Sequence, residues 1–178
     1  NYVSAKNIDD YREKLVKPQF PIHQFNSHTP KRLRILHVTN FNERHDGRLF
    51  FNTGRRLNNG FIRLGHSVLE FSDRDIVKHY KSFKDYSGSK TLNQKLINTV
   101  YNYKPDLLIF GHADLIKDNT LAYLKDNYKN LRTAQWFLDP LIKNGPDFNK
   151  KKLRILDKME FTDANFITTS PDVLNFLP

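Results

Sequence analysis

Short apolar runs alternate with helix-like segments along most of this chain. The runs lie at residues 33–40, 67–71, 107–110, 132–137 and 165–169. Continuous apolar runs of this length are typical of strands buried on both faces, and helical segments between such strands form right-handed crossovers that make the strands parallel. The pattern therefore predicts an α/β fold: a Rossmann-like parallel sheet of at least five strands with helices on both faces.

Four of the intervening segments carry apolar or small side chains at helical spacing. These are Phe50, Thr53, Leu57, Phe61 and Leu64 in the first, Leu92, Leu96, Val100 and Tyr103 in the second, Leu121, Leu124 and Tyr128 in the third, and Leu153, Leu156 and Met159 in the fourth. Gly65 follows the first helix, and we expect it to form a left-handed cap there. Residues 72–75 are interpreted as the end of the second strand, and residues 80–89 as a polar connection.

Residues 1–30 do not share this pattern. They contain Pro18, Pro21 and Pro30 and an amphipathic fragment around Tyr11 and Leu15. This composition predicts an N-terminal arm or short helix followed by an extended linker, with one Rossmann-like domain over residues 31–178. Because the first residue is Asn rather than Met, we expect the numbering to start inside a longer gene product.

Length and composition limit the class of protein. A chain of 178 residues without cysteine can bury one core, and it has no disulfide, thiolate metal ligand or cysteine nucleophile. No apolar run approaches the length of a membrane span, and no signal-peptide pattern opens the chain. These features predict a cytoplasmic protein.

The net charge of +10 is unevenly distributed. Residues 1–34 carry seven Lys or Arg against three Asp or Glu, and residues 143–158 carry six against two. Such excess can attract anionic lipid, nucleic acid or phosphorylated ligands, or it can be ordinary solvated surface. Because no helix-turn-helix or RNA-recognition pattern is present, we expect no specific nucleic-acid partner, and peripheral association of the basic arm with the inner face of an anionic membrane is the preferred functional interpretation.

Polar side chains follow every predicted strand. Since the carboxyl ends of parallel strands share one edge of the sheet, these side chains are candidates for one binding site. They are Asn42, His45, Gly47 and Arg48 after the first strand, Asp73 and Arg74 after the second, His112 and Asp114 after the third, Asp139 after the fourth, and Ser170 after the fifth.

Each candidate also has a structural interpretation. Asp73 and Asp114 are equally suited to cap the following helices, and His112 could be a hydrogen-bonded structural histidine. Trp136 is expected in the core. A carboxylate at Asp139 could end the strand or accept a proton from a hydroxyl group, and we favour the second role.

Familiar cofactor motifs are missing. The loop of residues 42–48 has one glycine, so it lacks the Gly-x-Gly-x-x-Gly sequence of a dinucleotide site, and no Gly-x-x-x-x-Gly-Lys-Ser/Thr loop exists. The spacing of His37, His45, His66 and His112 is not that of a metal site. We therefore expect neither a cofactor nor a bound metal.

Three motifs in order carry a family resemblance. They are RLGHSV at residues 63–68, KPDLLIFGH at residues 104–112 and ANFITTSP at residues 164–171. Together they resemble the N-terminal, acceptor-side domain of GT-B glycosyltransferases, including glycosyltransferase family 4 and the spore-maturation-type bacterial enzymes. The resemblance extends over about residues 33–171.

This resemblance implies transfer of a sugar from a nucleotide-sugar donor to a hydroxyl acceptor, a saccharide or a lipid-linked glycan, without a metal. It implies a C-terminal donor-binding domain outside these 178 residues, so the fragment alone is expected to be inactive. By position, Asp139 and His112 would be catalytic, residues 42–48 would approach donor phosphate or acceptor, and Arg48 at the start of a helix would contact an anion. The first loop departs from the family in having no Gly-Gly pair.

A different class of function stays open. A non-catalytic Rossmann or flavodoxin-like ligand-binding module would share the predicted fold. The sequence does not fit the receiver type of such a module. A receiver has acidic residues after the first and third strands, whereas this chain has Thr39-Asn40 and Gly111-His112 there. A flavin phosphate loop rich in Ser, Thr and Gly is missing after the first strand.

Overall fold

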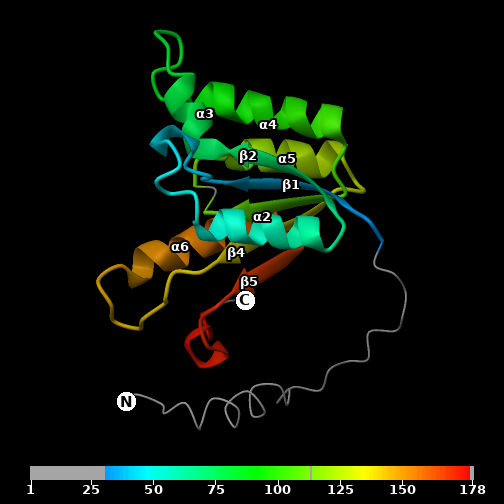
Figure 1. Cartoon of the computed structure of the whole chain (residues 1–178). Coiled ribbons are helices and arrows are strands. Elements are labelled where there is room, and N and C mark those ends of the chain that lie inside the picture. The colour runs from blue at the N-terminus through cyan, green and yellow to red at the C-terminus, as the bar shows by residue number, and fades with distance from the viewer. Residues whose placement is uncertain (1–30, 113, 177–178) are drawn as a thin grey trace, which may run out of the picture. The chain divides into compact units, whose positions relative to one another are not determined.

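The computed structural model describes residues 31–112 and 114–176; the predicted arm at residues 1–30 lies outside them. Five strands form one sheet in which all neighbours are parallel, in the order β2-β1-β3-β4-β5 (Figure 1). The strands are β1 (Arg34–Thr39), β2 (Ser67–Ser72), β3 (Leu107–Gly111), β4 (Arg132–Phe137) and β5 (Ala164–Ile167). The predicted α/β, Rossmann-like fold is confirmed.

Helices flank both faces of the sheet. They are α2 (Thr53–Arg63), α3 (Asp73–His79), α4 (Ser89–Tyr103), α5 (Asp118–Asn127) and α6 (Phe148–Met159), with short 3₁₀ turns η2 (Glu43–His45) and η3 (Pro171–Val173). On one face, Leu36 and Phe110 pack against α4 and α5 through Leu96 and Leu124. The long apolar runs are explained by this arrangement, because alternate side chains of a central strand enter different cores.

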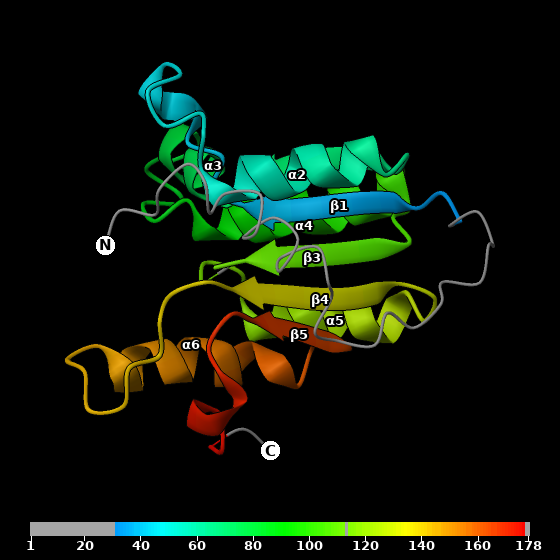
Figure 2. The same cartoon turned by 60° about the horizontal axis from the view of Figure 1, so that its bottom comes forward.

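The other face is covered less completely. Ile35, Ile109 and Ala134 pack beneath Leu57 and Phe61 of α2. Figure 2 shows α2 over the β1 side of the sheet, while β4 and β5 lie beyond it. Phe166 of β5, in register with Trp136, is 60% exposed as a result.

Helix α2 has the ends that its sequence predicts. The Asn52 side chain accepts a hydrogen bond from the Arg55 amide, and Gly65 follows the helix with φ of +87°. The Gly65 and His66 amides donate to the Ile62 and Phe61 carbonyls, the two bonds of a Schellman cap. The predicted start was wrong, however: the helix begins at Thr53, so Phe50 and Arg48 precede it.

Helix α3 was missed in the sequence because it is only seven residues long and follows its strand directly. The signal for it was Ser72 with Asp75 three residues later, a spacing typical of a helix N-terminus. Ile76 and Val77 pack against the same core as α4. The expected apolar face of α6 also needs correction, since Ile155 is buried whereas Leu153 is 56% exposed.

A glycine at the end of β3 lets the sheet accommodate its one tryptophan. The Trp136 indole from β4 lies over Gly111 and donates a hydrogen bond to His37 of β1, with Nε1 and Nε2 3.2 Å apart. A Cβ at position 111 would lie 2.0 Å from the indole Cζ2 atom. Any side chain there would therefore displace the tryptophan.

We predict that Gly111→Ala lowers the free energy of unfolding by about 2–3 kcal/mol, the usual cost of overpacking a core. Urea denaturation monitored by Trp136 fluorescence measures the change. Gly60→Ala is the matched control, because position 60 lies within α2 and a Cβ there has no atom within 4 Å. The control should gain about 0.5–1 kcal/mol from helix propensity, and equal stability of the two variants would contradict the steric explanation.

Candidate functional site

The strand order places a crevice between β1 and β3. β1 is followed by α2 on one face of the sheet, and β3 is followed by α5 on the other, so the two connections diverge at the carboxyl edge. Ligands of open α/β sheets bind at such a switch point. A cavity of about 300 Å³ lies there, lined by Thr39, Asn40, Asn52, Thr53, Gly54, Arg74, His112, Trp136, Leu138 and Asp139.

The two predicted catalytic side chains meet in this switch-point cavity. His112 Nε2 lies 4.0 Å from Asp139 Oδ1. The His112 backbone has a φ of +51°, a left-handed conformation that is costly for a residue with a Cβ, and its ring packs on Trp136 and Phe137. Local strain of this kind concentrates at functional sites, where it aims a side chain that a relaxed backbone would turn elsewhere.

The N-terminus of α2 faces the same cavity through Thr53 and Gly54. A Cβ on Gly54 would lie 2.7 Å from the Thr39 methyl group, so glycine permits the helix to approach the end of β1. Because Asn52 caps only the Arg55 amide, the first amides of the helix keep their partial positive charge toward the cavity. Together with the Arg74 guanidinium, this end of the cavity favours an anionic group.

Arg74 also joins the switch-point cavity to a smaller one. Its guanidinium lies 3.4 Å from the Asp114 carboxylate, which lies 3.1 Å from Arg154 of α6. Asp114 and Arg154 line a second hollow of about 80 Å³ that shares His112 and Trp136 with the first. The helix-cap interpretation of Asp114 was wrong, since α5 begins only at Asp118.

Asp73 is a buried carboxylate at the end of β2. It is fully inaccessible to solvent; Oδ1 accepts a hydrogen bond from the Arg74 amide, and among the described residues Oδ2 has no partner. Burial raises the pKa of Asp73 to about 6, against the opposing effect of the Arg74 amide. Asp73 is not among the residues that line the switch-point cavity, so the structure does not bring this predicted binding residue into the candidate site.

A buried polar network supports the cavity wall. Trp136 donates to His37, whose Nδ1 lies 3.3 Å from the Asn58 Oδ1 atom; the Asn58 amide donates to Glu70 at 2.7 Å, and Glu70 pairs with Arg55. Since His37 Nε2 accepts a hydrogen bond from the indole N–H group, Nδ1 carries the imidazole proton and the ring is neutral. Burial lowers the pKa of His37 to about 4. The sequence did not single out this histidine as a structural support.

Several predicted binding residues lie outside the switch-point cavity. Asn42 bonds to Asn40 in a left-handed turn, and Arg48 contacts His45 within an exposed segment that also contains Gly47. Ser170 is exposed beside Asp172 after β5. Of the predicted site residues, the structure therefore brings Arg74, His112 and Asp139 into the cavity, while Thr39, Asn52, Thr53 and Gly54 were missed.

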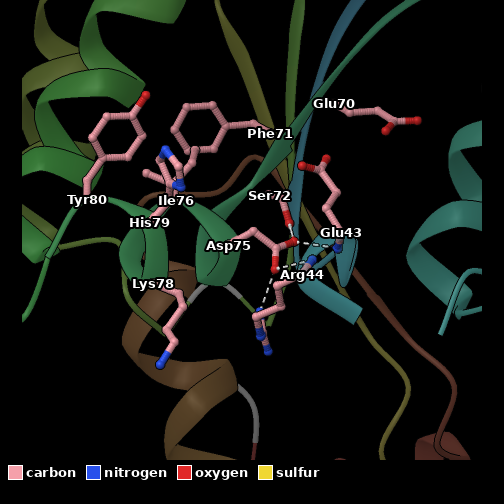
Figure 3. Close-up of a pocket in the computed structure, with 10 residues that line it drawn as sticks. All are labelled: Glu43, Arg44, Glu70, Phe71, Ser72, Asp75, Ile76, Lys78, His79 and Tyr80. Atoms are coloured by element: carbon pink, nitrogen blue, oxygen red, sulfur yellow. Dashed lines mark hydrogen bonds and ion pairs between the residues drawn. The ribbon is translucent and has the colours of Figure 1, made fainter. Parts of the chain in front are cut away.

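A larger hollow of about 670 Å³ lies beside the edge strand β2 (Figure 3). Three of its charged side chains are already paired: Arg44 lies 2.6 Å from Asp75, and Glu70 belongs to the buried network. Burial alone would raise the pKa of Asp75, but hydrogen bonds from Ser72, Glu43 and Arg44 outweigh it and lower the pKa. Because the switch-point cavity instead brings His112 and Asp139 together beside a helix N-terminus, we place the candidate site there.

Within the described ranges, no group of three or more His, Asp or Glu side chains could hold a metal ion, and no helix is long and apolar enough to cross a bilayer. No protein-family model, curated protein or solved structure matches the chain.

The depressed pKa of His37 predicts a pH-dependent stability. The folded-state pKa of about 4 lies below the ordinary value of 6.5. The contribution of His37 to the free energy of unfolding is therefore fully present above pH 6.5 and is lost as the pH falls toward 4. Between pH 7 and 4.5 the wild type should lose about 2 kcal/mol more than His37→Gln in urea denaturation. The exposed-residue control His79→Gln should follow the wild type, and parallel profiles for His37→Gln and wild type would exclude a neutral buried His37.

The pH dependence of stability that Asp73 predicts has the opposite sign. Because its folded-state pKa of about 6 lies above the ordinary 3.8, stability is lost as pH rises through 6 and the buried carboxyl ionises. The free energy of unfolding of Asp73→Asn should therefore be about 3 kcal/mol higher than that of the wild type at pH 7.5, and the gain should disappear below pH 4. Asp126→Asn, an exposed substitution on α5, provides the control. A destabilised Asp73→Asn protein at pH 7.5 would refute the unfavourable burial.

Proposed function

We propose that this protein is the acceptor-side domain of a two-domain GT-B-type glycosyltransferase, which transfers a sugar from a nucleotide-sugar donor to a hydroxyl acceptor. The observation that carries the proposal is the switch-point cavity, where a His112–Asp139 pair lies beside the N-terminus of α2 and Arg74. Two of the three sequence motifs that resemble GT-B enzymes, residues 104–112 and 164–171, end at this same edge of the sheet, whereas residues 63–68 lie at the opposite edge, where α2 ends and β2 begins. Donor binding is assigned to a second domain facing it.

The chemistry requires a proton acceptor and a site for negative charge. The acceptor hydroxyl oxygen attacks the anomeric carbon, the bond from that carbon to the nucleotide diphosphate breaks, and the leaving group departs with the electron pair. The His112 imidazole takes the hydroxyl proton, and the nearby Asp139 carboxylate stabilises the resulting imidazolium. The acceptor itself is a saccharide or a lipid-linked glycan.

The positive end of the cavity has a complementary role. Amides at the start of α2 and the Arg74 guanidinium stabilise negative charge on the donor diphosphate or on a phosphorylated acceptor. No divalent ion is needed for this task, because backbone dipoles and a guanidinium neutralise the phosphates. Arg74 is held in place by Asp114, which also binds Arg154.

A second candidate is a non-catalytic, flavodoxin-like ligand-binding module. The strand order β2-β1-β3-β4-β5 favours it, because this is the order of flavodoxin-like folds. In such a module the switch-point cavity would bind an anionic ligand without turnover. The two proposals differ in whether a second domain is required.

Transferase assays across a panel of nucleotide sugars test the first proposal. They use a protein that contains this chain together with its donor-binding domain. His112→Ala and Asp139→Asn should each lower kcat/KM by about 100-fold or more, the usual contribution of general acid–base catalysis. Asp126→Asn on the distant surface of α5 should retain wild-type kcat/KM.

Calorimetry on the 178-residue chain separates the alternatives. Weak or absent binding of every nucleotide sugar agrees with a half-site, whereas tight binding of a nucleotide by this chain, without turnover in the longer protein, would replace the transferase by the ligand-binding module.

A further inference from the structure

The loop between α3 and α4, residues 80–88, presents aromatic side chains to solvent. Phe83 is 92% exposed and Tyr86 is 75% exposed, and their rings pack edge to face with centroids 6.2 Å apart. Figure 1 shows this loop standing out beyond the two helices that it connects. Apart from their contact with each other, the two rings are left largely in water within the described part of the chain, and such an exposed apolar patch indicates a contact made outside it.

Several local interactions hold this aromatic loop in shape. The amides of Ser82 and Asp85 each donate to the carbonyl of the other at 3.1 Å, which places Phe83 and Lys84 at the apex of a tight turn. At its base, Gly88 adopts a φ of +67°, and a Cβ there would lie 2.6 Å from the Val77 carbonyl oxygen. The exposure of the aromatic side chains is therefore a built feature of the fold.

Lysines surround the aromatic tip. Residues 78–90 contain Lys78, Lys81, Lys84 and Lys90 against the single acid Asp85. Asp85 accepts hydrogen bonds from the Thr91 amide and the Ser87 hydroxyl, so its carboxylate serves the start of α4. Lys78, Lys81 and Lys84 lie in the exposed stretch of residues 78–84. Within the described part of the chain, none of the four lysines forms an ion pair.

We propose that the aromatic loop docks the protein on an anionic lipid bilayer, with Phe83 and Tyr86 entering the headgroup region and the lysines contacting lipid phosphates. Aromatic rings favour the membrane–water interface, and lysines near an anionic surface add attraction. A nucleic acid fits less well, because single strands bind in grooves with open ring faces, whereas these rings form a protruding edge-to-face pair.

The position of the loop relates this contact to the candidate site. The loop leads into α4, where Asn93 bonds to the Leu115 carbonyl and the Lys117 amide in the segment after β3. His112 belongs to the start of that same segment. A bilayer bound at the loop would therefore lie near the carboxyl edge of the sheet. The docking proposal itself does not depend on sugar transfer, and its test contains no nucleotide sugar.

Co-sedimentation of the full chain with lipid vesicles tests the proposal. We expect binding to vesicles of phosphatidylcholine with about a third phosphatidylglycerol, little binding to phosphatidylcholine alone, and release by high salt. The variants F83S/Y86S and K81Q/K84Q should each reduce the partition coefficient by about tenfold. Tyr101→Ser and Lys129→Gln, which alter an exposed aromatic ring and an exposed lysine elsewhere, should bind like the wild type.

A fluorescent reporter distinguishes insertion by the loop from attraction by other basic segments. In Phe83→Trp, the added indole should shift its emission to the blue and be quenched by brominated acyl chains on anionic vesicles, whereas Tyr101→Trp should show neither change. Failure of the wild type to sediment with anionic vesicles would overturn the proposal. So would wild-type binding by F83S/Y86S, or binding without quenching of the Phe83→Trp reporter.

Discussion

The contact between Trp136 and Gly111 fixes the carboxyl edge of the sheet. The indole starts on β4, passes over the glycine at the end of β3 and donates a hydrogen bond to His37 on β1. One side chain thus links three strands, and it also forms a wall of both cavities at this edge. Because the indole N–H group has a hydrogen-bond partner inside the core, Trp136 can be buried without leaving an unpaired polar group.

The buried polar groups behind this contact differ in how well they are satisfied. His37, Asn58, Glu70 and Arg55 form a continuous chain of hydrogen bonds and an ion pair that restricts the position of α2 on the sheet, although the Arg55 Nε atom has no partner among the described residues. Asp73 has one oxygen without a partner among the described residues, and its burial opposes folding at neutral pH. Asp73 is the first residue of α3, directly after β2, and it is not among the residues that line the switch-point cavity.

The candidate site combines rigid and exposed parts. His112 directly follows β3 and Asp139 lies two residues after β4; packing on Trp136 and Phe137 restricts the His112 ring. In the first loop, Arg48 contacts His45, and Glu43 and Arg44 bond to Asp75 of α3. The sequence pattern does not separate the two groups, because each follows a predicted strand. Only the turns of η2 and the true start of α2 at Thr53 show that the loop leads away from the cavity while the helix N-terminus enters it.

The sequence by itself determined the α/β class, the five strands and the side of the sheet on which a site would form, because these follow from hydrophobic period and from the shared direction of parallel strands. It also determined the left-handed cap at Gly65. The tertiary structure alone decided the order of the strands, the pairing of Arg74 with Asp114 across 40 residues of chain, and the bond between Trp136 and His37 across 99. These depend on side chains that meet only after the sheet has assembled, and no local pattern encodes a contact between residues so far apart.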